Sequence, residues 1–301
     1  MTPELTVQPK VALPIAALKA LRPKQWTKNG VLLVPLLFAK SVFVEGQLMR
    51  AGLSVAAFSL LASGVYLVND WFDREKDRLH PEKRNRPIAA GLLGLPSVLV
   101  LLAMCWGGAL ATSFMLGRQF VIVAVSYVAL QIVYTTVLKH MVVLDVMALA
   151  LGFIVRVVAG AVAIDVAVSN WLFLCTLLGA VFLGFAKRRA ELSSLEEGAS
   201  AHRASLGEYT QTMLDQMMSI SAACTILAYG LYTVSPETIQ RVGSDHLKLT
   251  VPCVIFGVFR YLFLVHKRGL GGAPEKILLS DVPLILDIVA FLGIVAWGLY
   301  F

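Results

Sequence analysis

Charged residues are scarce in this sequence. Of its 301 residues, 15% are Asp, Glu, Lys or Arg, whereas soluble domains typically contain about 25%. Apolar residues make up 58% of the chain, and the mean hydropathy is +0.77. So few charges cannot cover the surfaces of the two soluble domains that this length would otherwise suggest. We therefore expect one membrane-embedded domain, residues 1–301, that is solvated mainly by lipid.

Cysteine and histidine are also few, and neither is spaced as in a metal site. The four cysteines each stand alone in an apolar run without a CxxC pair, and the five histidines show no ligand spacing. We expect the cysteines to be small buried apolar side chains. The N-terminus lacks a compact signal peptide, because four prolines interrupt residues 1–29. We expect this segment to be cytoplasmic or interfacial.

The apolar residues gather in runs of the length that crosses a bilayer, about 20 residues. Nine such runs predict an all-α, polytopic membrane bundle with nine transmembrane helices. Their approximate bounds are 30–45, 52–69, 92–115, 119–138, 142–164, 170–186, 215–234, 248–266 and 282–301.

The chain is basic, with 26 Lys and Arg against 19 Asp and Glu. The cations fall in short loops between apolar runs, which indicates membrane topology and not a nucleic acid partner. With alternating runs, 19 of the 26 lie on the side of the N-terminus, five on the other side and two inside runs. This bias predicts a bacterial inner membrane protein with its N-terminus and loops 70–91 and 187–214 in the cytoplasm and its C-terminus outside. The sequence leaves open whether the chain forms a homo-oligomer.

A group of carboxylates follows the second apolar run. In a continuing helix, Asn69, Asp70, Asp73 and Asp77 lie on one face at one-turn spacing. Stacked carboxylates repel one another unless a cation lies between them, and Mg²⁺ prefers oxygen ligands from one or two carboxylates plus substrate phosphates. We therefore expect Asn69, Asp70, Asp73 and Asp77 to bind Mg²⁺. The alternative is a solvated loop of mixed charge.

Cations follow the carboxylates directly. Lys83, Arg84 and Arg86 are suited to grip phosphate oxygens beside a metal. For any one of them, the bias of cytoplasmic loops toward positive charge is an alternative explanation.

In these residues the sequence resembles the UbiA superfamily of intramembrane prenyltransferases. The NDxxDxxxD motif at Asn69–Asp77 is similar to the superfamily's first aspartate motif. The string from Tyr66 through Asp77-Arg78, His80-Pro81 and Arg86-Pro87 to Gly91 resembles one branch, the decaprenyl-phosphate phosphoribosyltransferases. The segments Leu21–Asn29, Lys139-His140 and Leu206–Thr210 extend this resemblance along the chain. The branch makes a lipid-linked ribose precursor of arabinan.

The second cytoplasmic loop departs from the prenyl-transferring pattern. Where typical members carry a second DxxxD motif, this chain has Lys187, Arg188 and Arg189, and Glu191 is the one remaining carboxylate. Cations in place of a second metal site suit a donor with more phosphate, such as phosphoribosyl pyrophosphate (PRPP).

The resemblance implies transfer of 5-phosphoribose from PRPP to a polyprenyl (decaprenyl) phosphate, with release of diphosphate. Asp70, Asp73 and Asn69 would be catalytic through the metal at the leaving diphosphate. The remaining residues expected to bind substrate are Lys28 and Lys139 at the lipid phosphate, Lys187, Arg188, Glu191 and Tyr209 near the 5-phosphate, and Gln131, Tyr134 and Arg156 in the cavity.

Several expectations have alternatives. Arg156 is equally consistent with a structural ion pair to Asp145 or Asp287, and Gln131 and Tyr134 with interhelical hydrogen bonds. A UbiA-type prenyltransferase that moves a polyprenyl chain from its diphosphate to an aromatic acceptor shares the first motif but requires a second acidic one. A lipid carrier without chemistry would show paired repeats, and no second NDxxDxxxD is present.

Overall fold

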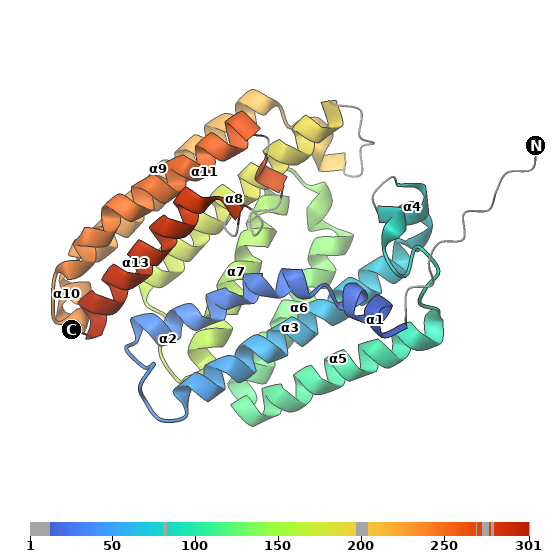
Figure 1. Ribbon diagram of the computed structural model, residues 1–301, viewed down its shortest axis with the longest axis horizontal. Helices are drawn as coiled ribbons and strands as arrows, with labels where there is room; N and C mark the ends of the chain where they lie inside the picture. Colours follow the sequence, from blue (N-terminus) through green and yellow to red (C-terminus); the bar gives the residue numbers. More distant parts are fainter. Residues whose placement is uncertain are drawn as a thin grey trace, which may run out of the picture.

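The computed structural model describes residues 13–80, 83–196, 204–268, 270–272, 277 and 280–300. The described chain is helical throughout and contains no strand, which confirms the all-α expectation (Figure 1). Eight helical segments are long and apolar enough to cross a membrane. Their helices are α3 (Gln47–Phe72), α5 (Leu95–Leu116), α6 (Arg118–Thr136), α7 (Leu144–Ala163), α8 (Asn170–Glu196), α9 (Gln211–Val234), α11 (Val251–Arg268) and α13 (Val282–Tyr300). The chain is therefore an integral, multi-pass membrane protein.

Shorter elements connect these helices. The α-helices among them are α1 (Leu13–Leu21), α2 (Val34–Phe38), α4 (Arg74–Leu79) and α10 (Pro236–Val242). The 3₁₀-helices are η1 (Pro23–Leu33), η2 (Lys83–Asn85), η3 (Leu138–His140), η4 (Ala204–Glu208), η5 (His246–Thr250) and η6 (Leu270–Gly272).

The first predicted span, 30–45, differs from expectation. The chain there consists of the 3₁₀-helix η1 followed by the short helix α2, so the described residues contain eight long apolar helices where nine were predicted. A 3₁₀-helix rises about 2.0 Å per residue, and η1 and α2 together are roughly 30 Å long at that rise and the α-helical rise. This segment thus has nearly the length of a bilayer core without being a single α-helix.

Packing against α3 explains why η1 is wound so tightly. Trp26 Nε1 donates to Ser63 Oγ at 3.0 Å, and Asn29 Nδ2 donates to Ser59 Oγ at 3.0 Å. Three residues of a 3₁₀-helix rise about 6 Å, as do four residues of an α-helix. The two elements therefore stay in register, one turn of each against the other.

On its other side, η1 approaches α7 closely at Gly160. A methyl group at Gly160 would lie 2.1 Å from the carbonyl oxygen of Leu32. Only glycine permits this contact without moving one of the two elements. The helix α7 packs against η1, α3, α6 and α8 and is the central helix of the bundle.

We expect Gly160→Ala to lower the free energy of unfolding by about 1–3 kcal/mol, because the added methyl overpacks the contact between α7 and η1. Thermal unfolding in detergent micelles measures the effect. The matched control is Gly107→Ala in α5, where nothing lies within 4 Å of the added methyl. Equal melting temperatures for the two variants would contradict this packing.

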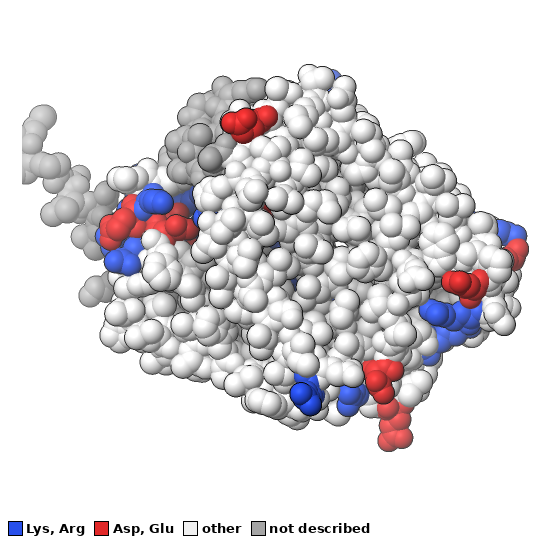
Figure 2. Space-filling view, turned by 180° about the vertical axis from the view of Figure 1, so that it is seen from behind, with Lys and Arg blue, Asp and Glu red and all other residues white. Residues whose placement is uncertain are grey.

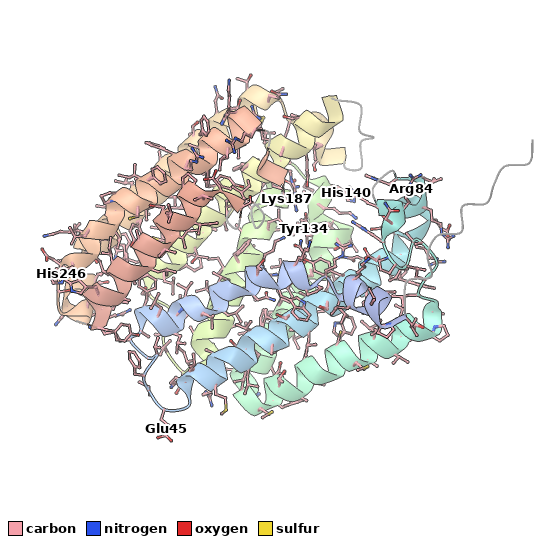
Figure 3. All side chains as sticks on the ribbon, viewed as in Figure 1. Glu45, Arg84, Tyr134, His140, Lys187 and His246 are labelled. Atoms are coloured by element: carbon pink, nitrogen blue, oxygen red, sulfur yellow. The ribbon has the colours of Figure 1, made fainter. Side chains whose placement is uncertain are left out.

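The bundle has two polar ends. In Figure 3, Arg84, His140 and Lys187 lie toward one end, although they come from three separate elements. Glu45 and His246 lie at the other end. Figure 2 shows a broad uncharged surface with charged side chains at its margins, as expected for a surface that contacts lipid. The loops that were predicted to be cytoplasmic are thus at the same end.

Candidate active site

The first polar cluster lies where α3 passes into α4. Arg86 Nη1 is 3.0 Å from Asp70 Oδ1 and 2.7 Å from Asp77 Oδ2, so one guanidinium nitrogen contacts both carboxylates. Arg22 Nη2 is 2.5 Å from the same oxygen of Asp70. Asp70 and Asp77 are each 4% exposed. The two carboxylates therefore converge on a shared cation and are not spread into solvent.

Backbone hydrogen bonds keep the motif helical across the junction of α3 and α4. The amide of Asp73 donates to the carbonyl of Asn69 at 2.9 Å, and the amide of Asp77 donates to the carbonyl of Asp73 at 2.8 Å. Asp73 is the C-cap of α3, and its side chain is half-buried. None of the described residues forms an ion pair with the Asp73 carboxylate. Asp73 thus differs from its two neighbours in having no internal cation.

The carboxylate oxygens of the motif fit a Mg²⁺ ion that is also bound by the substrate. Within the described ranges, no three Asp, Glu, His or Cys side chains form a group that could hold a metal ion alone. Carboxylate oxygens are nevertheless the ligands that Mg²⁺ prefers, and it usually takes one or two of them together with substrate phosphates. The motif therefore fits a metal that arrives with phosphate oxygens. Arg86 lies between Asp70 and Asp77, so a cation bound by both would have to displace or share this guanidinium.

Arg22 links the N-terminal segment to this cluster. It precedes η1 in the left-handed backbone region, with φ 54° and ψ 57°, which is uncommon for a residue other than glycine. Its guanidinium lies 4.7 Å from the centre of the Tyr66 ring in addition to its contact with Asp70. These contacts offset the backbone strain and place a cation beside the carboxylates.

The second polar cluster surrounds Arg188. This side chain is fully buried, and it donates to Asp145 Oδ2 at 2.5 Å, Glu191 Oε2 at 2.6 Å and the Tyr134 hydroxyl at 3.3 Å. The Tyr209 hydroxyl donates to Asp145 Oδ1 at 2.9 Å. The cluster therefore connects α6, α7, α8 and the segment after η4.

Tyr209 also supports a strained residue. Its hydroxyl accepts a hydrogen bond from the amide of Val143 at 2.7 Å, and Val143 has a φ of 65°, an outlier for a β-branched residue. Burial raises the pKa of Tyr209 to about 12, so the hydroxyl keeps its proton at neutral pH. Tyr209 thus fixes the start of α7 beside Asp145.

Two residues that were predicted to bind substrate are already hydrogen-bonded within the protein. Arg188 and Tyr209 were predicted to contact the 5-phosphate, but their polar atoms already bind Asp145, Glu191, Tyr134 and Val143. These contacts hold the end of α8 against the start of α7, and a contact of Arg188 or Tyr209 with the 5-phosphate stays a prediction. Lys187, which is half-buried, lies at the same end of the bundle as Tyr134 (Figure 3).

The other predicted phosphate-binding cations lie on short elements. Lys83 and Arg84 are in η2, half-buried and exposed respectively. Lys28 donates to Gln25 Oε1 at 2.6 Å, one 3₁₀ turn away. Lys139 is half-buried in η3, and its carbonyl accepts from Ser205 Oγ at 3.0 Å. Gln131 is half-buried in α6.

Arg156 does not form either of the ion pairs considered for it. Its guanidinium donates to Asn29 Oδ1, the Gly152 carbonyl and the Tyr127 hydroxyl, each at 2.9 Å. Asp145 is paired with Arg188 instead. Asp287 lies on α13 beside Gly257 of α11, away from these contacts.

Four contributing residues were outside the predicted site: Arg22, Asn29, Tyr127 and Asp145. Arg22 and Asn29 flank the Pro23–Lys28 stretch that carries part of the family resemblance, which was a usable signal. Asp145 opens an apolar helix, where a carboxylate is rare. Tyr127 is one of three aromatic residues in α6, and nothing local in the sequence distinguishes it.

Two cavities among the described residues lie elsewhere. One, of about 320 Å³, is lined by α2, α8, α9, α10 and α13. The other, of about 300 Å³, lies between α8, α9, α11 and α13. Neither is lined by Asp70, Asp73, Asp77 or Arg188, so neither is the predicted site.

A multi-pass helical bundle with clustered carboxylates and arginines at one polar end defines a membrane-embedded enzyme of the UbiA prenyltransferase type. The chain matches the UbiA prenyltransferase family over residues 31–273. It belongs to this family, which confirms the resemblance noted in the sequence.

Relatives of known name and structure agree with this assignment. The chain is 34% identical over 306 residues to the decaprenyl-phosphate phosphoribosyltransferase of Mycolicibacterium smegmatis, covering 98% of this chain and 96% of the relative. It is 37% identical over 292 residues to the nodulation protein NoeC of Azorhizobium caulinodans, covering 94% and 92%. Its fold is similar to a UbiA homolog from Archaeoglobus fulgidus bound to GPP and Mg²⁺, with a TM-score of 0.71, 18% identity and coverage of 95% and 100%.

Proposed function

We propose that this protein transfers 5-phosphoribose from PRPP to a polyprenyl phosphate, decaprenyl phosphate in the first instance, and releases diphosphate. The observation that carries the proposal is the run of cations Lys187, Arg188 and Arg189 in the last turns of α8, where the family resemblance leads one to expect a second aspartate motif. The similarity to the M. smegmatis phosphoribosyltransferase over nearly the whole chain supports it. The product would be a lipid-linked ribose precursor for cell-envelope arabinan.

The first cluster would bind the leaving group. Asp70 and Asp73, with Asn69 and Asp77, would hold Mg²⁺, which when bound neutralises charge on the departing diphosphate. Arg22 and Arg86 contact these carboxylates, and they and Lys83 in the following η2 are cations that suit diphosphate oxygens. A Mg²⁺ ion bound by both Asp70 and Asp77 would displace the Arg86 guanidinium from between them. The guanidinium could then bind the diphosphate.

The transfer step depends on how PRPP and the acceptor phosphate are positioned more than on acid–base chemistry. An oxygen of the acceptor phosphate forms a bond to C1 of ribose as the bond from C1 to the diphosphate oxygen breaks. Because the acceptor is already an anion, no general base has to remove a proton. Lys187, which adjoins the buried Arg188 cluster in sequence, would hold the 5-phosphate. Lys28 and Lys139 would meet the lipid phosphate at the membrane boundary, before it moves into the bundle.

The orientation in the membrane is part of the proposal. The excess of cations on the loops at the Arg84 and Lys187 end favours a cytoplasmic location for that end in a bacterial inner membrane. PRPP is water-soluble and cytoplasmic, so this orientation gives it direct access.

An extraction assay tests the transfer. Purified protein is incubated with labelled PRPP, Mg²⁺ and decaprenyl phosphate, and we expect label in the organic phase only when all three are present. A parallel reaction with a prenyl diphosphate and 4-hydroxybenzoate tests the prenyltransferase alternative that the family name suggests. Prenylated product without lipid-linked ribose would refute the proposal.

A further inference from the structure

Arg156 is a buried cation that has no anion beside it among the described residues. It is 7% exposed in the central helix α7, and all three of its hydrogen bonds to the described residues go to neutral groups. No carboxylate of the described residues pairs with it, whereas Arg188 and Arg260 in other spans pair with Asp145 and Asp281. A charge in this environment is unfavourable by several kcal/mol unless an opposite charge compensates it.

The surroundings of Arg156 leave donors for a ligand. A guanidinium has five N–H groups, and three of them are used by Asn29, Gly152 and Tyr127. The Gln131 carboxamide points to the same place, because its Nε2 and Arg156 Nη1 both lie 3.6 Å from the position that a Gly152 Cβ would take. Nothing within the described chain hydrogen-bonds to the Gln131 side chain. Unused guanidinium and amide N–H groups side by side form an anion-binding arrangement.

The depth of this arrangement indicates which anion it binds. Arg156 lies eleven residues beyond Asp145 on α7, about 16 Å along the helix. Its partner Asn29 lies seven residues beyond Arg22 on η1, about 14 Å along the 3₁₀-helix. Both paths place Arg156 roughly halfway through a bilayer core about 30 Å thick.

We propose that Arg156 and Gln131 form the subsite for the phosphate of the polyprenyl acceptor, inside the bundle. This inference rests on the proposed function, in which a water-soluble donor enters from the polar end and a lipid acceptor enters from the membrane. The acceptor phosphate must then reach C1 of ribose from the deep side, opposite the leaving diphosphate. Arg156 is on that side of Asp70 and supplies the charge that draws a phosphate away from the membrane surface.

A binding experiment without PRPP tests the subsite independently of ribose transfer. Protein in nanodiscs is titrated with decaprenyl phosphate and with the neutral alcohol decaprenol, and bound lipid is counted by native mass spectrometry. Charge-assisted hydrogen bonds contribute about 1.5–3 kcal/mol each, so we expect wild-type protein to prefer the phosphate by about 10–100-fold. Arg156→Gln should remove most of this preference.

Gln131→Leu keeps the proposal testable if Arg156→Gln fails to fold, because the Gln131 side chain makes no hydrogen bond to the described residues. We expect it to reduce the phosphate preference at an unchanged melting temperature. Arg260→Gln is the matched control, since this span arginine has its own carboxylate in Asp281, and it should retain the preference. The affinity for PRPP should be unchanged in Gln131→Leu and Arg260→Gln.

Three outcomes would overturn the subsite. One is an unchanged preference for the phosphate lipid in Arg156→Gln and Gln131→Leu. Another is a parallel loss of PRPP binding and lipid binding in Gln131→Leu, which would indicate that Gln131 maintains the structure and does not bind the lipid phosphate. The third is competition by millimolar inorganic phosphate as strong as that by decaprenyl phosphate, which would assign the site to the free anion. If wild-type protein preferred decaprenyl phosphate over decaprenol but transferred no ribose, the proposed function alone would be refuted.

Discussion

Asp73→Ala is expected to reduce turnover by at least about 100-fold, the scale seen when one preorganised group that stabilises the transition state is removed. The folded protein should persist, because none of the described residues forms an ion pair with the Asp73 carboxylate, which is half-buried at the end of α3. Asp70 is a less informative position. Its replacement leaves Arg22 and Arg86 without their shared anion and mixes catalytic with structural loss.

Initial rates at increasing Mg²⁺ concentration, alongside melting temperatures, measure the effect of Asp73→Ala. Glu75→Ala is the control, since Glu75 is an exposed carboxylate two residues away that pairs only with Arg74 and Arg78 among the described residues. It should retain nearly full activity. Equal activities for the two variants would show that the carboxylates of this stretch are interchangeable surface charges and would remove the metal site from the account.

Arg188→Met is expected to lower the free energy of unfolding by about 3–5 kcal/mol, because it leaves Asp145 as a buried charge without its partner. Both side chains are 0% exposed. The double variant Arg188→Met/Asp145→Asn should recover much of this loss, since it removes both charges together.

The adjacent residue supplies the comparison. Arg189 pairs with Asp215, whose side chain is 36% exposed, so Arg189→Met should change stability by only about 0–1 kcal/mol. Unfolding in detergent measures all three variants. If Arg188→Met were as stable as Arg189→Met, the buried pair of Arg188 and Asp145 would not be stabilising the contact between α8 and α7.

The long spans could be predicted from the sequence because each is a local property. The apolar run 142–164 corresponds to α7 (Leu144–Ala163), and 119–138 to α6 (Arg118–Thr136). The run 30–45 was not resolved into η1 and α2 because their geometry depends on distant residues. Ser59 and Ser63 set the register of η1, and Gly160 admits it against α7. Apolar periodicity contains none of this information.

The candidate site also has features that could be predicted from the sequence and features that could not. The spacing of Asp70, Asp73 and Asp77 was visible in the sequence, since one-turn spacing is local. The pairing of both Asp70 and Asp77 with Arg86 was not, because it requires the chain to fold back after α4. Lys187, Arg188 and Arg189 were equivalent in the sequence, whereas their burial separates Arg188 from its neighbours.

The central claim is that a phosphoribosyl group moves from PRPP to a lipid phosphate, and PRPP labelled in two places tests it most directly. One label is ¹⁴C in the ribose, and the other is ³²P in either the 5-phosphate or the diphosphate. The account predicts that ribose and 5-phosphate labels enter the decaprenyl lipid in the ratio of the donor, while diphosphate label stays in the aqueous phase. Diphosphate label in the lipid, or ribose label without the 5-phosphate, would contradict it.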